Sequence, residues 1–344
     1  MVEVGGLERA DAYVDALVAE LERERGRLGP RETVYLGGGT PTLVGAGRLA
    51  GLLGAIRPHL APGTEVTVEA NPETVDEALL AALVDAGATR ISIGAQSLRP
   101  HVLRALDRRA GPEAVRAAVR LARAAGFRSV SMDLLFAVPG QDAGDLAADV
   151  AEVLQLRPDH VSWYELELKP GSALAARGTE PVDEDLAADA YRDLVGALEG
   201  AGYEWYETAN FALPGHRCRH SLACWGAADY LGIGVGAVST VDGLRWRNAA
   251  GVDAYLAAAR AGRPPRRSLE RLDPDTRRRE RWMLAMRTAG PVDAAWAGRL
   301  DHPDRLGDLE RTGLVRRVPG GIELTREGRF VQNAVLGELM EYAS

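Results

Sequence analysis

A regular alternation of short apolar runs with amphipathic patterns constrains the fold of this chain most. Strand-like runs lie near residues 33–36, 66–69, 90–94, 129–133 and 160–166. Helix-like patterns cover residues 8–27, 43–58, 73–86, 112–125, 143–156 and 184–200. Strand–helix units of about 30–40 residues build parallel sheets with right-handed crossovers. The chain is therefore predicted to be an α/β protein with at least five parallel strands.

Glycine and polar residues lie at the carboxyl ends of four of these strand-like runs. They are the Gly37–Gly39 turn, Glu69, Gln96 and Asp133. In parallel α/β folds, functional groups gather at the carboxyl ends of the strands. Glycine lets the backbone approach a ligand closely, and the first amides of a helix can receive an anionic group. These residues predict a single ligand pocket.

Four motifs, taken in order, carry a family resemblance. They are Gly37-Gly38-Gly39-Thr40-Pro41-Thr42, Glu69-Ala70-Asn71-Pro72, Ser92-Ile93-Gly94-Ala95-Gln96-Ser97, and Met132-Asp133-Leu134-Leu135-Phe136 with Pro139-Gly140-Gln141. The set resembles the radical S-adenosylmethionine (SAM) proteins of the anaerobic coproporphyrinogen oxidase type, and most of all their heme chaperones. The resemblance covers nearly the whole chain. It implies a partial (β/α)6 barrel, whose first strand is missing from this sequence, followed by a small C-terminal helical and winged domain.

The resemblance also implies which residues contact SAM. Backbone amides would hold its methionine end, carboxylates would accept hydrogen bonds from its amino group or ribose hydroxyls, and an amide and a guanidinium would donate. The residues concerned are Gly38, Gly39, Thr40, Glu69, Gln96, Arg108 and Asp133. Other interpretations stay open. Glu69 could cap the next helix, Asp133 could be an internal acceptor, and Arg108 could be a surface cation beside Asp107.

The cluster-binding segment of the family is absent from this sequence. Relatives begin with C-x-x-x-C-x-x-C, three cysteines that hold a [4Fe-4S] cluster, whereas this chain has two cysteines, Cys218 and Cys224. Cluster ligation is by cysteine thiolates, so the chain offers no cluster ligand set and should not cleave SAM. We hypothesise a mis-assigned start, with roughly 20–30 residues lost, enough for a strand and a loop. The strand at 33–36 would then be a sheet edge.

A second chemical region runs from Glu207 to Trp225. It resembles the chaperone segment that ends in H-N-x-x-Y-W and is tied to heme binding; here the last six residues are His220-Ser221-Leu222-Ala223-Cys224-Trp225. Imidazole and thiolate are both axial ligands of heme iron. His220 is the heme-ligand candidate, with His216 and Cys224 in reserve. Alternatively, His220 binds a loop and Trp225 fills the core. Zinc held by these residues together with Cys218 is less favoured, because ligands this close in sequence would crowd a tetrahedral site.

The C-terminal third has a different pattern. Pro264-Pro265 and the charged run Arg266–Arg281 mark a junction, so we expect a barrel over residues 1–245, which includes the heme-motif segment 207–225, and a separate domain over residues 250–344. That domain should contain a helix with Trp282, short helices near 293–300 and 304–312, a hairpin turning at Gly320-Gly321, and a closing helix over 325–342.

Composition restricts the partners. The net charge of −8 argues against nucleic acid, even though winged domains often bind DNA. No apolar run reaches the roughly 20 residues needed to span a bilayer, which leaves peripheral membrane contact open. The start of the chain lacks the apolar core of a signal peptide, and two cysteines suggest a reducing cytoplasm.

Two classes of function are consistent with these observations. The first is a heme chaperone that binds heme and passes it to a client protein, with SAM and the family's [4Fe-4S] cluster assisting. The second is a radical SAM oxidoreductase acting on a porphyrinogen. A degenerate member without a cluster is a further alternative. The partial heme motif favours the chaperone.

Overall fold

The computed structural model describes residues 7–27, 29–169, 171, 173–293, 302 and 304–340. The chain divides into two compact units. The first comprises Met1–Val182 with Asp229–Leu272, and the second comprises Asp183–Ala228 with Asp273–Ser344. The predicted domains, residues 1–245 and 250–344, stay a prediction, and the compact units group the residues differently.

Five parallel strands form the centre of the first unit, as predicted. In spatial order they are β1 (Arg31–Leu36), β2 (Leu60–Ala70), β3 (Arg90–Gln96), β4 (Ser129–Phe136) and β5 (His160–Glu165). The register pairs Glu69 with Ser92 and Gly94 with Asp133, which brings these residues of three adjacent strands near one another. β1 is the edge strand of this order, which agrees with the sequence-based prediction.

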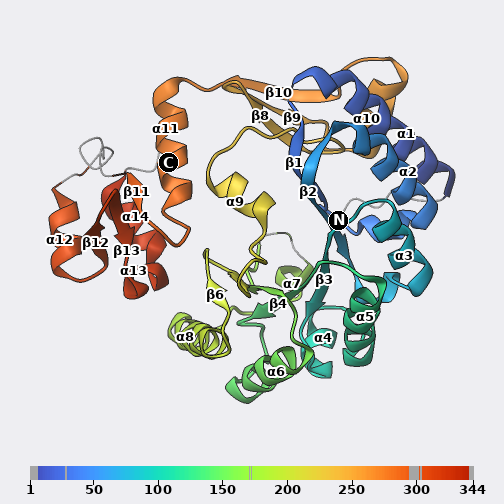
Figure 1. Cartoon of the computed structure of the whole chain (residues 1–344). Helices are drawn as coiled ribbons and strands as arrows, with labels where there is room; N and C mark the ends of the chain where they lie inside the picture. The colour runs from blue at the N-terminus through green and yellow to red at the C-terminus, as the bar shows by residue number, and fades with distance from the viewer. Residues whose placement is uncertain are drawn as a thin grey trace. The chain divides into compact units, whose positions relative to one another are not determined.

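Helices cover the outer side of these strands. α2 (Ala46–Ile56), α3 (Glu77–Asp85) and α5 (Pro112–Ala125) follow one another beside β1, β2 and β3 (Figure 1). The local sequence fixes their ends. Asp76 caps α3 by accepting from the Leu79 amide, α6 (Ala143–Leu156) begins with a capping box, and α5 ends at Gly126 in the left-handed region. α4 (Pro100–Ala105) and α7 (Ala173–Ala176) are short.

An antiparallel sheet completes the first unit and was not predicted. It consists of β8 (Val238–Val241), β9 (Leu244–Asn248) and β10 (Arg266–Arg271), with α10 (Val252–Arg260) between the last two. The beginning of the run interpreted as a junction is therefore a strand. α1 (Leu7–Glu24) packs against α10, and its Glu20, only 3 % exposed, accepts hydrogen bonds from the Tyr255 hydroxyl, the Asn248 amide and the Gly234 backbone.

The second unit contains α8 (Glu184–Gly200), the antiparallel pair β6 (Glu204–Trp205) and β7 (Asn210–Ala212), α9 (Arg219–Trp225) and α11 (Pro274–Ala285). A winged part follows, with β11 (Val292–Asp293), α12 (Arg305–Arg311), β12 (Val315–Val318) and β13 (Gly321–Leu324). Its core includes Trp282, Ile322 and Leu336. The hairpin and the helix near 304–312 are confirmed, whereas the expected helix near 293–300 falls largely outside the described residues.

The closing segment differs from the prediction of one helix over 325–342. It forms α13 (Arg326–Phe330) and α14 (Gln332–Leu339), because Val331 leaves the helical conformation at φ −119°. Residues 341–344 lie outside the described part of the chain. No helix in the described ranges combines the length and apolar character that crossing a membrane requires.

Candidate functional site

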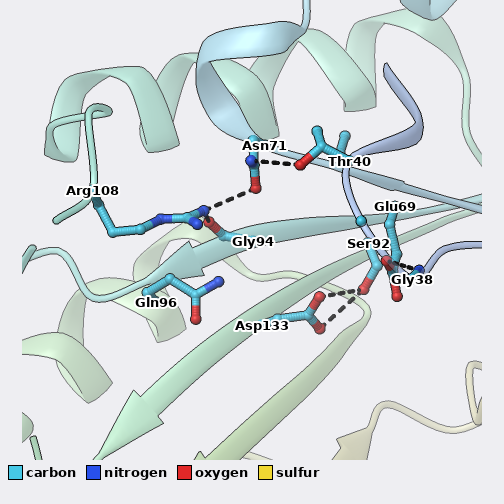
Figure 2. A pocket seen from close by; sticks show the side chains of 11 residues that line it. Gly38, Thr40, Glu69, Asn71, Ser92, Gly94, Gln96, Arg108 and Asp133 are labelled. Atoms are coloured by element: carbon cyan, nitrogen blue, oxygen red, sulfur yellow. Dashed lines mark hydrogen bonds between the residues drawn. The ribbon is translucent and has the colours of Figure 1, made fainter. Parts of the chain in front are cut away.

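A cavity of about 370 Å³ opens at the carboxyl ends of the parallel strands. This volume lies in the range of small-molecule sites, roughly 300–1,000 Å³. All seven residues predicted to contact SAM line it (Figure 2). The lining residues are Gly38, Gly39, Thr40, Glu69, Ala70, Asn71, Ser92, Gly94, Gln96, Arg108 and Asp133. The structure thus brings the predicted residues together, and their role toward SAM stays a prediction.

The glycine turn after β1 is built around the Glu69 carboxylate. Glu69 accepts hydrogen bonds from the Tyr35 hydroxyl at 2.8 Å and from the Gly38 amide at 3.1 Å. Burial raises the pKa of Glu69, against the effect of these two donors. A Cβ added at Gly37 would lie 2.7 Å from the Glu69 carboxyl carbon and 2.6 Å from the Tyr35 ring. Glycine is therefore required for the close packing of turn and carboxylate. α3 is capped by Asp76, so the alternative role of Glu69 as a helix cap is wrong.

Arg108 lies at the opposite side of the cavity, linked to two strand ends. Its guanidinium donates to the Asn71 side-chain oxygen at 2.8 Å and to the Gly94 carbonyl at 2.9 Å. The Asn71 amide in turn donates to the Thr40 hydroxyl at 2.9 Å (Figure 2). A chain of hydrogen bonds therefore joins Arg108 to the glycine turn. The alternative interpretation of Arg108 as a surface cation is wrong.

Asp133 is the carboxylate at the floor of the cavity. Both of its oxygens accept from the Ser92 hydroxyl at 2.9 Å, and the Ser162 hydroxyl is a further donor. Burial raises the pKa of Asp133 to about 6, and the neighbouring Glu69 carboxylate adds to this shift. Its hydrogen-bond donors are hydroxyl groups, which can rotate toward another acceptor. Asp133 can therefore accept from a ligand without a change in the backbone.

Gln96 reaches the cavity through an irregular strand end. The register of β3 shifts between Gly94 and Gln96, and Gln96 adopts φ +65°, which is rare for a residue with a side chain. The next residues are held by the fully buried Asp149, which accepts from the Ser97 hydroxyl at 2.6 Å and the Leu98 amide at 2.9 Å. These contacts keep the strand end in place, and backbone strain of this kind is common at ligand sites.

The chemistry of the cavity fits SAM. Two carboxylates are available to an ammonium group or ribose hydroxyls, while Arg108 and Gln96 can donate to a carboxylate or to adenine. A Cβ at Gly94 would come within 3.1 Å of polar atoms of both Gln96 and Asn71, so glycine keeps this polar wall accessible. Sequence reasoning did not assign Ala70, Asn71, Ser92 and Gly94. Ser92 and Gly94 could have been found, because they share a strand face with Gln96.

The second chemical region lies on α9. His220 and Cys224 are one turn apart on this helix, with 3.8 Å between the imidazole Nε2 and the thiol Sγ. Both side chains are half-buried, as is Trp225. Burial raises the pKa of the Cys224 thiol. Cys218 is buried at the start of the helix, where its amide donates to the Tyr206 hydroxyl. α9 therefore carries two potential ligands of heme iron, His220 and Cys224.

A [4Fe-4S] cluster does not fit the residues of this chain. Such a cluster needs three thiolates, and the chain has two cysteines, neither of them in the first unit. The described residues contain no group of three or more His, Cys, Asp or Glu side chains placed to hold a metal ion. No step through a cluster is therefore derived.

Comparisons with known proteins agree with the fold and with the resemblance seen in the sequence. Residues 8–153 match the model of the Radical SAM superfamily. The heme chaperone HemW of Mycobacterium tuberculosis (strain CDC 1551 / Oshkosh) is 36% identical over 346 residues, which cover 98% of this chain and 88% of that protein. HemW of Escherichia coli (strain K12) is 37% identical over 231 residues, covering 66% of this chain and 61% of that protein.

Two further comparisons cover nearly the whole chain. HemW of Bacillus subtilis (strain 168) is 29% identical over 346 residues, with 96% of this chain and 91% of that protein covered. The solved structure of coproporphyrinogen III oxidase from Escherichia coli superimposes with a TM-score of 0.85 at 22% identity, covering 98% of this chain and 85% of that one. This likeness shows a shared fold. On the strength of its full-length similarity to these chaperones, the chain belongs to the HemW family of radical SAM proteins.

Proposed function

We propose that this chain binds heme on α9 through His220 and passes it to a heme-accepting client protein. The observation that carries the proposal is the full-length similarity to proteins named heme chaperone, 36% over 346 residues, together with a half-buried histidine on α9. Neutral imidazole is a common axial ligand of heme iron. The half-buried position of His220 suits a cargo that must be both bound and released.

SAM is the ligand that we propose for the cavity of the first unit. Glu69 and Asp133 would accept from its ammonium group or ribose hydroxyls, and Arg108 would hold its carboxylate or its adenine ring. In radical SAM proteins, bound SAM supplies a 5′-deoxyadenosyl radical when a reduced cluster cleaves it. In this chain the side chains of the cavity bind and orient the ligand, and no radical step follows from them.

The heme proposal is tested by titrating the purified chain with hemin and recording the Soret band. We expect His220→Ala to weaken hemin binding at least about tenfold, since it removes the coordinating nitrogen. His101→Ala is the control, because His101 lies on α4 in the first unit and should leave the titration unchanged. An identical Soret band and affinity in His220→Ala would contradict the assignment, and Cys224 would then be the ligand to test.

The oxidoreductase alternative receives less support. The solved coproporphyrinogen III oxidase shares the fold at 22% identity, a level that supports the fold alone. We therefore favour the chaperone over an enzyme acting on a porphyrinogen.

A further inference from the structure

The helix that carries His220 is short and has little to hold it in place by itself. α9 has seven residues, and none of them is buried. Its first residue is preceded by Cys218, whose side chain makes no capping hydrogen bond. Helices this short are unstable alone and depend on contacts with the rest of the protein. The orientation of His220 must therefore be set by contacts at the ends and sides of α9.

Two adjacent buried residues contact the two ends of this helix. The Tyr206 side chain is fully buried, and its hydroxyl accepts from the Cys218 amide at 3.3 Å, at the start of α9. Glu207 is 1 % exposed, and its carboxylate accepts from the indole of Trp225, the last residue of α9. One dipeptide thus holds both ends of the heme-motif helix.

The Glu207 carboxylate is itself fixed from several directions. It accepts from the side-chain amide of Asn210 and from the backbone amide of Ala209 at 3.4 Å. The Glu207 carbonyl accepts from Arg329 of α13 at 3.5 Å, and the Arg329 guanidinium lies 3.6 Å above the Trp205 ring. Because these contacts fix the Glu207 carboxylate, it would not move together with the Trp225 indole if that indole were displaced. Glu207 is therefore a rigid anchor for the Trp225 indole.

We propose that Tyr206 and Glu207 are positioning residues for heme, which set the orientation of His220 by holding the two ends of α9. This inference rests on the proposed function and adds residues that do not touch the cargo. It gives the Trp225 indole N–H a role in heme binding through its hydrogen bond to Glu207. It also separates alignment of the ligand helix from coordination of the iron.

A double-mutant cycle tests the C-terminal anchor. Trp225→Phe removes the donor of this hydrogen bond, and Glu207→Gln replaces its charged acceptor with the weaker oxygen of a neutral amide. Each should weaken hemin binding roughly fivefold and broaden the Soret band. If Glu207 acts through Trp225, the hemin affinity of the double variant should equal the lower of the two single-variant affinities. Additive losses, or an unchanged affinity and band shape in Glu207→Gln, would overturn the proposal.

Matched variants control for folding and for the other end of the helix. Glu204→Gln changes an exposed glutamate of the same segment, paired with Arg217 at 2.8 Å, and should bind hemin like the wild type. Tyr206→Phe removes only the hydroxyl at the N-terminal end and should also broaden the Soret band. If Glu207→Gln does not fold, Trp225→Phe and Tyr206→Phe decide the matter, and unchanged hemin binding in both would overturn the proposal.

The failure of this inference can be told apart from that of the proposed function. Hemin binding that is unaffected by His220→Ala contradicts the function itself. A loss of binding in His220→Ala, together with wild-type titrations in Glu207→Gln, Trp225→Phe and Tyr206→Phe, contradicts only the positioning role.

Discussion

Two carboxylates, Asp133 in the first unit and Glu207 in the second, both have raised pKa values but lie in different surroundings. Burial is the main cause of a raised pKa in both, to about 6 for Asp133 and to about 7 for Glu207. Asp133 receives hydroxyl donors and borders a cavity, whereas Glu207 receives backbone, amide and indole N–H donors and is 1 % exposed. The difference teaches that a raised pKa alone does not mark a ligand site. A ligand site is distinguished by the kind of hydrogen-bond donor around the carboxylate and by a cavity beside it.

The largest expected effect is on stability. Glu207→Ala leaves the Asn210 amide, the Trp225 indole and backbone amides without their acceptor, at a cost of roughly 2–4 kcal/mol. For a chain of 344 residues the thermal unfolding midpoint should fall by roughly 3–6 °C. Asp133→Ala should change it by less than about 2 °C, because Ser92 and Ser162 can turn toward water in the cavity. Differential scanning calorimetry checks both values, and equal losses in the two variants would break the comparison.

The next effect is on SAM binding. Here the change at Asp133 should have the larger effect and the change at Glu207 none. Asp133→Asn should weaken SAM binding about tenfold, because an amide replaces one acceptor oxygen with a donor. Isothermal titration calorimetry of the purified chain with SAM measures this loss. Glu207→Gln serves as the control and should bind SAM like the wild type. Equal SAM affinity in wild type and Asp133→Asn would show that the Asp133 carboxylate does not contact the ligand.

The remaining effect is the dependence of stability on pH. The Glu207 pKa rises from its ordinary value of 4.5 to about 7 on folding, so the folded protein binds the proton more tightly than the unfolded chain. Protonation then stabilises the folded state, and this contribution is lost as pH rises from about 4.5 to about 7.

Unfolding midpoints measured between pH 4 and 8 distinguish the pH dependence due to Glu207 from that due to Asp133. Glu207→Gln cannot titrate, so it should gain stability relative to the wild type as pH rises through that window. For Asp133→Asn the same relative gain should fall between the ordinary value of 3.8 and about 6. A constant difference between Glu207→Gln and the wild type across the series would mean that the Glu207 carboxyl does not change its proton affinity on folding.

Much of the first unit could be predicted because its signals are local. Each parallel strand is a short apolar run, and polar residues near its carboxyl end lie at the edge of the sheet where ligands bind. Glu69 and Asp133 were identified in this way. The antiparallel sheet was missed although Asp242-Gly243, a two-residue hairpin signal, joins β8 to β9. β10 is harder to predict, because it contains arginines and pairs with β9 across the intervening α10.

The anchoring role of Glu207 also lay beyond sequence reasoning. Its partners Asn210 and Trp225 become neighbours only after β7 and α9 have formed, and no spacing rule links them to a glutamate. The break at Val331 was missed for a related reason. A helical pattern continues through it, and the conformation of one residue divides the segment into α13 and α14.

The Glu20 network has a consequence for the order of folding during synthesis. The acceptor is on α1, but its donors Asn248 and Tyr255 come 228 and 235 residues later in the chain. At translation rates of about 5–20 residues per second, α1 leaves the ribosome roughly 10–50 s before these donors are made. During that interval its apolar face lacks α10, and a carboxylate destined for burial is still hydrated. α1 is therefore synthesised long before it can reach its final contacts.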